Sequence, residues 1–220
     1  SLTLYSTYQA YELPERVPKL YGFFSWRMFQ DIGIEDMLSA GRETLQGVED
    51  FLDAWISYLR EQDDSYTSRL LIEAVTYRGG DEGLLEEAKR EPNHCPKLYI
   101  RMLERFFEKE EWDRLQKEGM EALSRMERKI EMRDRAARLA AAGAARCRDA
   151  AEEMDALCEA FCSKPTAANY FRVITSPGAG KKTENEKTAR MLQTAEELQA
   201  ALQDGEKPRE YGLWNRYKRK

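Results

Sequence analysis

LYIRMLERFFEKEEWDRLQKEGMEALSRM, residues 98–126, contains two apolar stripes separated by a short charged segment. In each half the apolar residues recur at steps of three and four, which is the spacing of one face of an α-helix. Pro96 precedes the first half, at a position where the first turn of a helix tolerates proline. Residues 109–111 form the charged turn, and Trp112 begins the second half. The stretch predicts two antiparallel helices joined by a tight turn.

The same pattern occurs on both sides of this pair. Upstream, an apolar stripe over residues 66–77 ends at Gly79-Gly80, and a second short helix is predicted over 82–90, before a proline. Downstream, a third pair is predicted over 130–165. Small residues near the end of each return helix lie at similar intervals, with 34 residues from Ala88 to Ala122 and 38 from Ala122 to Ala160. Regular spacing of like elements is typical of a solenoid.

These observations predict an all-α protein, a right-handed α-solenoid of antiparallel helix pairs. We expect residues 1–64 to form an aromatic N-terminal cap with short helices, 65–175 the helical-repeat core, and 176–220 a loop, a C-terminal helix and a basic tail. A chain of 220 residues is long enough for one sizeable core, so the three parts are expected to form one continuous domain.

The central pair resembles a tetratricopeptide-type helix pair. Leu103 and Phe106 fall near the inner positions of that motif, Trp112 at its turn aromatic and Ala122 at its late small residue. The early tryptophan of the motif is absent, and Gly119 stands at its later aromatic position. More widely, residues 65–175 are similar to helical-repeat regions of bacterial proteins, some of which follow a SWIM-type zinc finger; the cysteines and the single histidine here lack that finger's spacing.

The resemblance implies an adaptor-like surface, a concave groove lined by the first helix of each pair. In the tetratricopeptide register, Lys97, Glu104 and Phe107 face that groove. Phe107 would serve as the anchor for a protein or peptide partner, and the two charged residues would select it. The expected function is therefore a non-enzymatic protein- or peptide-binding scaffold. Replacing Phe107 by Ala should weaken binding of the partner and leave thermal stability nearly unchanged.

The segments outside the repeats give coarser predictions. The first thirty residues are rich in Tyr, Phe and Trp, and Pro14 and Pro18 predict an irregular lead-in before a short helix. Their aromatic side chains would cap the apolar end of the helix stack, or else dock a missing domain or a second copy. Glycines between residues 22 and 47 predict brief helices, and periodic apolar residues predict a firm helix over 48–60.

Composition limits the function classes. The net charge of −5 is modest and spread along the chain, so no overall field favours nucleic acid or an acidic membrane. No apolar run approaches the roughly 18 residues of a membrane span, and the N-terminus lacks a signal-peptide pattern. We expect a cytoplasmic protein. Its start at Ser1 suggests an expression scar or a fragment of a longer polypeptide, and its oligomeric state is left open.

Residues 171–183, FRVITSPGAGKKT, partly match a phosphate-binding loop. That motif needs a glycine, four residues, and Gly-Lys followed directly by Ser or Thr. Here Lys182 follows Gly180-Lys181, and Thr175 stands where the first glycine belongs. Only 37 residues follow the segment, too few for the required parallel sheet. We expect a glycine loop between a helix over 167–174 and a last helix over 183–203; a phosphate- or nucleotide-binding enzyme using Lys181 and Lys182 is the alternative.

The remaining candidates for chemistry also favour structural roles. His94 and Cys95 are neighbours in a proline-bounded connection, whereas a nucleophile and its base normally come from distant segments. One histidine leaves zinc without a set of four ligands, and we expect no metal, cofactor or catalytic residue. The cysteines 147, 158 and 162 are expected to be core thiols without disulfides.

Two further patterns concern charge. Adjacent glutamates such as Glu86-Glu87, Glu110-Glu111 and Glu152-Glu153 point about 100 degrees apart on a helix, and a solvated helix face explains them. The C-terminal residues 214–220 mix aromatic and basic side chains, a composition that can hold single-stranded nucleic acid. Basic ends are common, so nucleic-acid binding through the tail is kept as a second alternative only.

Overall fold

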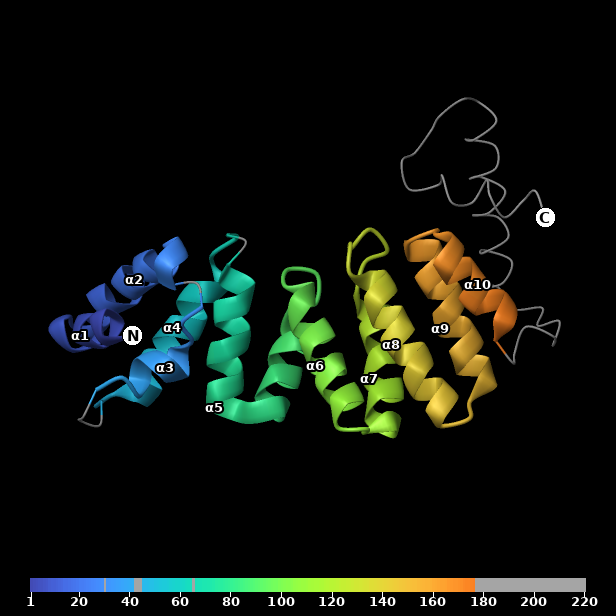
Figure 1. Cartoon of the computed structure of the whole chain (residues 1–220), viewed down its shortest axis with the longest axis horizontal. Coiled ribbons are helices and arrows are strands. Elements are labelled where there is room, and N and C mark those ends of the chain that lie inside the picture. The colour runs from blue at the N-terminus through green and yellow to red at the C-terminus, as the bar shows by residue number, and fades with distance from the viewer. Residues whose placement is uncertain (30, 42–44, 65, 177–220) are drawn as a thin grey trace, which may run out of the picture. The chain divides into compact units, whose positions relative to one another are not determined.

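The computed structural model describes residues 1–29, 31–41, 45–64 and 66–176 (Figure 1). Every regular element in these ranges is helical, which confirms the predicted all-α class. Within the same ranges, no helix has both the length and the apolar character needed to cross a membrane. Contacts divide the chain into two compact units, Ser1–Arg90 (unit 1) and Glu91–Lys220 (unit 2).

Unit 1 contains five α-helices and one turn of 3-10 helix among its described residues. They are α1 Leu2–Ala10, α2 Leu13–Phe24, η1 Arg27–Phe29, α3 Ile34–Leu38, α4 Val48–Arg60 and α5 Thr67–Arg90. The helix predicted over 48–60 is confirmed as α4, and the elements between residues 22 and 47 are brief, as predicted. Helix α4 packs against α2 and α5, and α3 packs against α5.

The irregular lead-in expected in the first thirty residues is wrong, because α1 and α2 occupy most of it. Pro14 lies in the first turn of α2, where its missing N–H would have had no intrahelical acceptor. Pro18 lies inside α2 and is exposed, so it removes one backbone hydrogen bond on the solvent side. Burial of Leu20, Tyr21 and Phe24 on the other face stabilises the helix despite that loss.

The core of unit 1 is built from aromatic rings. Trp55 on α4 is fully buried and stacks on Phe51, with ring centroids 5.7 Å apart. Tyr8 from α1 meets Phe51 edge-on at 5.0 Å, and Phe24 from α2 lies 5.8 Å from Trp55. The N-terminal aromatic residues therefore cover the apolar face of α4.

Helix α5 bends sharply at Gly80, where φ is 59° and ψ is −146°. This region of backbone space is essentially restricted to glycine, because a Cβ would collide with the neighbouring peptide. The helix break predicted at Gly79-Gly80 is thereby confirmed, and the two arms of α5 lie on either side of it (Figure 1).

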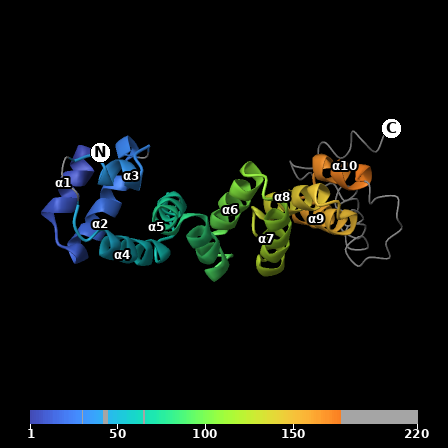
Figure 2. The ribbon, with the colours of Figure 1, turned by 90° about the horizontal axis from the view of Figure 1, so that it is seen from below.

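Unit 2 contains five helices among its described residues, each packed on the next. They are α6 Pro96–Glu108, α7 Trp112–Arg125, α8 Arg133–Arg146, α9 Ala150–Ser163 and α10 Ala167–Thr175. The helices predicted over 98–126, 130–165 and 167–174 are confirmed. Helix α6 also contacts α8, and Figures 1 and 2 show α7, α8 and α9 side by side. The loop, helix and tail predicted over 176–220 lie outside the described residues, apart from Ser176.

Helices α7 and α8 approach each other closely because glycine lies at both contacts. A Cβ at Gly119 would lie 2.7 Å from Ala140 Cβ, and one at Gly143 would lie 2.6 Å from the backbone N of Gln116. Both separations are shorter than packed carbon and nitrogen atoms tolerate. The close approach leaves no room for a side chain at Gly119 or Gly143.

A buried arginine joins three helices of unit 2. Arg133, at the start of α8, donates hydrogen bonds to the carbonyl oxygens of Leu123 (2.6 Å) and Met126, at the end of α7. Its Nη2 also lies 3.0 Å from Oε2 of Glu159 on α9, and both side chains are buried. The guanidinium thus satisfies otherwise unpaired carbonyls at the C-terminus of α7 and neutralises a buried carboxylate.

Candidate functional site

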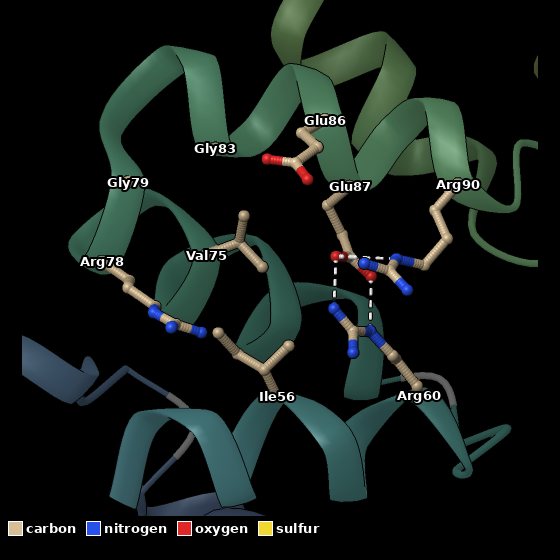
Figure 3. A pocket seen from close by; sticks show the side chains of 9 residues that line it. All are labelled: Ile56, Arg60, Val75, Arg78, Gly79, Gly83, Glu86, Glu87 and Arg90. Atoms are coloured by element: carbon tan, nitrogen blue, oxygen red, sulfur yellow. Dashed lines mark hydrogen bonds and ion pairs between the residues drawn. The ribbon is translucent and has the colours of Figure 1, made fainter. Parts of the chain in front are cut away.

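The elbow of α5 encloses a pocket against α4, in unit 1 (Figure 3). This elbow pocket has a volume of about 340 Å³. Its apolar side chains come from Ile56 on α4 and Val75 on the first arm of α5, and its charged side chains are three arginines and two glutamates. The lining residues are Ile56, Arg60, Val75, Arg78, Gly79, Gly83, Glu86, Glu87 and Arg90.

Ion pairs occupy most of the charged groups of the elbow pocket. Arg60 donates Nε–H to Oε1 of Glu87 at 2.7 Å and Nη2–H to Oε2 at 2.6 Å, a bidentate arrangement. Nε of Arg90 lies 3.7 Å from the same carboxylate, and Arg78 pairs with Asp53 on α4. Figure 3 shows Glu86 pointing into the pocket, while Glu87 turns toward Arg60. These pairs brace both arms of α5 against α4.

The solvated face expected for adjacent glutamates is wrong for Glu87, which is only 8% exposed. The bend at Gly80 returns the second arm of α5 to α4, where Arg60 provides a matching charge. Among the described residues that line the elbow pocket there is no histidine, cysteine or hydroxyl side chain, and its carboxylates are those of Glu86 and Glu87.

The three residues expected to contact a partner lie on α6. Lys97 is exposed in its first turn, Phe107 in its last turn is 45% exposed, and Glu104 is partly exposed between them. The ring of Phe107 meets Trp112 edge-on, with centroids 5.4 Å apart. The guanidinium of Arg146, at the end of α8, lies over the ring of Trp112, 5.1 Å from its centroid. Phe107 is therefore half-exposed and supported from one side.

Glu104 connects α6 to α8. Its carboxylate pairs with Arg101 on its own helix, at 3.8 Å, and with Arg135 on α8. Arg138 follows Arg135 by three residues, so the two lie on the same side of α8. Side chains of α6 and α8 thus form one surface, which we call the first-helix face. It comprises five charged residues and one aromatic residue: Lys97, Arg101, Glu104, Arg135, Arg138 and Phe107.

A second cavity continues the first-helix face toward α10. It has a volume of about 360 Å³ and lies between α8, α9 and α10. Alanine side chains of α8 and Leu157 of α9 form its apolar part, and Arg138 and Arg172 provide positive charge. We call it the alanine groove; its lining residues are Arg138, Ala141, Ala142, Ala145, Glu153, Leu157, Arg172, Thr175 and Ser176. Composition alone did not reveal it, because its residues come from three helices.

Histidine and cysteine side chains lie apart from these cavities. His94 is exposed in the turn before α6, while its neighbour Cys95 is buried. All four cysteines are among the described residues, and none forms a disulfide bond. Burial raises the pKa of the Cys147 thiol, and its hydrogen bond to Asp113 Oδ1, at 3.3 Å, acts in the same direction. A thiol held protonated is a poor nucleophile.

In the described part of the chain, no three His, Cys, Asp or Glu side chains come close enough together to hold a metal ion. The glycine loop with Lys181 and Lys182 and the basic tail both lie outside the described residues. The described residues thus form two cavities with charged linings. In the elbow pocket most charged groups are held in ion pairs, and the alanine groove shares Arg138 with the first-helix face.

No protein-family model, curated protein sequence or solved structure gave a significant match to this chain.

Proposed function

We propose that this chain is a non-enzymatic scaffold that binds a protein or peptide on the surface formed by α6, α8 and α10. These are the first helices of the successive pairs in a tetratricopeptide-like α-solenoid, the arrangement that we propose for the repeats. The single observation that carries the proposal is the continuity of the first-helix face with the alanine groove, through the Glu104–Arg135 ion pair and Arg138.

The composition of this surface supports binding rather than catalysis. It combines one half-exposed aromatic side chain, Phe107, with charged residues around a cavity floored by small side chains. Aromatic and arginine residues next to a pocket are the side chains that most often dominate protein interfaces. Among the described residues that line the alanine groove, Thr175 and Ser176 carry hydroxyl groups, and no histidine is present to activate them.

A selection from a peptide library displayed on phage, using the full chain as bait, tests the proposal. Peptides that bind the first-helix face should lose affinity for Phe107→Ala and for Ala142→Leu, which fills the alanine groove. Phe107→Ala should cost at most about 1.5 kcal/mol of stability, since it removes one edge contact with Trp112.

Trp26→Ala provides a matched control, because Trp26 is a 54% exposed aromatic residue in unit 1. Selected peptides should bind this variant as they bind the natural sequence. If both Phe107→Ala and Ala142→Leu bound every selected peptide with unchanged affinity, the result would contradict the proposed binding role of this surface.

A further inference from the structure

The floor of the alanine groove allows a close approach to α8. Ala141, Ala142 and Ala145 present only methyl groups, and Leu157 adds the apolar side chain from α9. The cavity of about 360 Å³ is large enough for a few residues of extended chain. The floor of small side chains leaves room for the backbone of an extended peptide to lie directly on α8.

Two arginines border this floor with donors to spare. Arg138 donates Nε–H to the backbone oxygen of Asp134 at 3.3 Å and Nη2–H to Oδ2 of the same residue at 3.1 Å. Arg172 donates Nη1–H to Oδ1 of Asn169 at 3.0 Å. A guanidinium carries five N–H donors, so each arginine can still bind a carboxylate. Glu153, the one acidic residue among the described residues of the lining, accepts a hydrogen bond from Ser176 Oγ at 3.2 Å.

Charge is distributed unequally between the helices that form the groove. The charged residues of α8 that are not buried are all positive: Arg135, Arg138 and Arg146. Helix α9 carries acidic side chains at four positions and no lysine or arginine. The α8 side of the groove is therefore basic although the chain as a whole has a net charge of −5, and α9 contributes one carboxylate, Glu153, to the described lining. An acidic ligand would complement Arg138 and Arg172.

No aromatic side chain occurs among the described residues that line the groove, so bases of a single-stranded nucleic acid would find none of these residues to stack on. From these observations we infer that the partner of the alanine groove is an extended acidic peptide segment of another protein, with carboxylates bound by Arg138 and Arg172. This inference rests on the proposed function and specifies its ligand.

Fluorescence anisotropy on the full chain tests the inference with a labelled peptide of alternating Glu and Ala. The same peptide with Gln in place of Glu, and a labelled single-stranded oligothymidine, serve as comparison probes. Arg138→Ala and Arg172→Ala should each weaken binding of the Glu–Ala peptide about tenfold, since each removes a charge-assisted contact. Arg128→Ala, which removes an exposed arginine from the α7–α8 connection, should leave binding unchanged.

The Gln–Ala peptide should bind at least about tenfold more weakly than the Glu–Ala peptide, because it lacks the carboxylates. Equal loss with Arg128→Ala would mean unspecific charge attraction, and tighter binding of oligothymidine would indicate nucleic acid; either result overturns the acidic-peptide inference. Library peptides without acidic residues whose binding is blocked by Ala142→Leu would also overturn the acidic-peptide inference, but they would support the scaffold function. If no library peptide depended on the first-helix face, the result would contradict both the scaffold function and the acidic-peptide inference.

Discussion

The core of unit 1 and the contact between α7 and α8 in unit 2 bury apolar surface by opposite means. In unit 1 the largest buried side chains are aromatic, with Trp55, Tyr8, Phe24 and Phe51 meeting around α4. In unit 2, α8 buries alanines at five positions and lies against α7 through Gly119 and Gly143. A core of large rings is sensitive to truncation, whereas helices in near-backbone contact are sensitive to added atoms.

The largest effect is expected from Trp55→Ala in unit 1. Trp55 is fully buried between the rings of Phe51 and Phe24, so its truncation should cost about 3–5 kcal/mol. Hydrogen exchange of amides over 48–60 should speed up accordingly. Trp26→Ala, at an exposed tryptophan, is the control and should change exchange little. A small effect of Trp55→Ala would mean that unit 1 does not depend on its aromatic core.

The reverse substitution, from small to large, should damage unit 2. Gly143→Ala adds a methyl group 2.6 Å from the backbone N of Gln116, and backbone atoms cannot rotate away as a side chain can. We expect a loss of about 1–3 kcal/mol, measured as faster hydrogen exchange over 112–146. Unchanged exchange would show that α7 and α8 can separate without cost.

The difference between the units also marks what the sequence could predict. Apolar periodicity located α4, α6, α7, α8 and α9, because each buries one face at helical spacing. It could not reveal that Gly119 meets Ala140, since that contact depends on the register between two helices. Two prolines in the sequence argue against the helix α2, which nevertheless forms because Pro14 lies in its first turn and Pro18 on its exposed side.

Charged residues were the least predictable part of the candidate surfaces. A charged residue is expected to lie in solvent, yet Glu87 and Arg133 are buried, with ion-pair partners 27 and 26 residues away in the sequence. Lys97, Glu104 and Phe107 could be proposed from the repeat register alone. The alanine groove could not, because Arg172 and the alanines of α8 belong to different helices.

The aromatic core also predicts how unit 1 responds to high pH. Burial is the main cause that raises the pKa of Tyr21 above its ordinary value of 10.0. The folded protein therefore holds this proton more tightly than the unfolded chain. Its contribution to stability is fully present below about pH 10 and is lost as the pH rises from there toward the raised pKa of the folded state.

Tyr21→Phe tests that prediction, because Phe has no proton to lose. The variant should lose about 1 kcal/mol at neutral pH, together with the hydrogen bonds to Asp64 (2.8 Å) and Thr67 (2.9 Å). Above pH 10 its stability should fall less steeply than that of the natural sequence, in urea unfolding followed by circular dichroism. Equal slopes would mean that Tyr21 ionises as freely in the folded protein as in the unfolded chain.

The smallest effect, and the sharpest contrast with Gly143, is expected from Gly22→Ala. Gly22 lies within α2 and is exposed, and a Cβ there would meet no atom within 4 Å. Alanine loses less backbone entropy than glycine on forming a helix, so this variant should gain about 0.5–1 kcal/mol in urea unfolding. The same substitution would then stabilise unit 1 and destabilise unit 2. Because helix propensity favours alanine at both sites, a loss at Gly143 can arise only from the contact with α7, and equal gains at both would remove the close-packing account of unit 2.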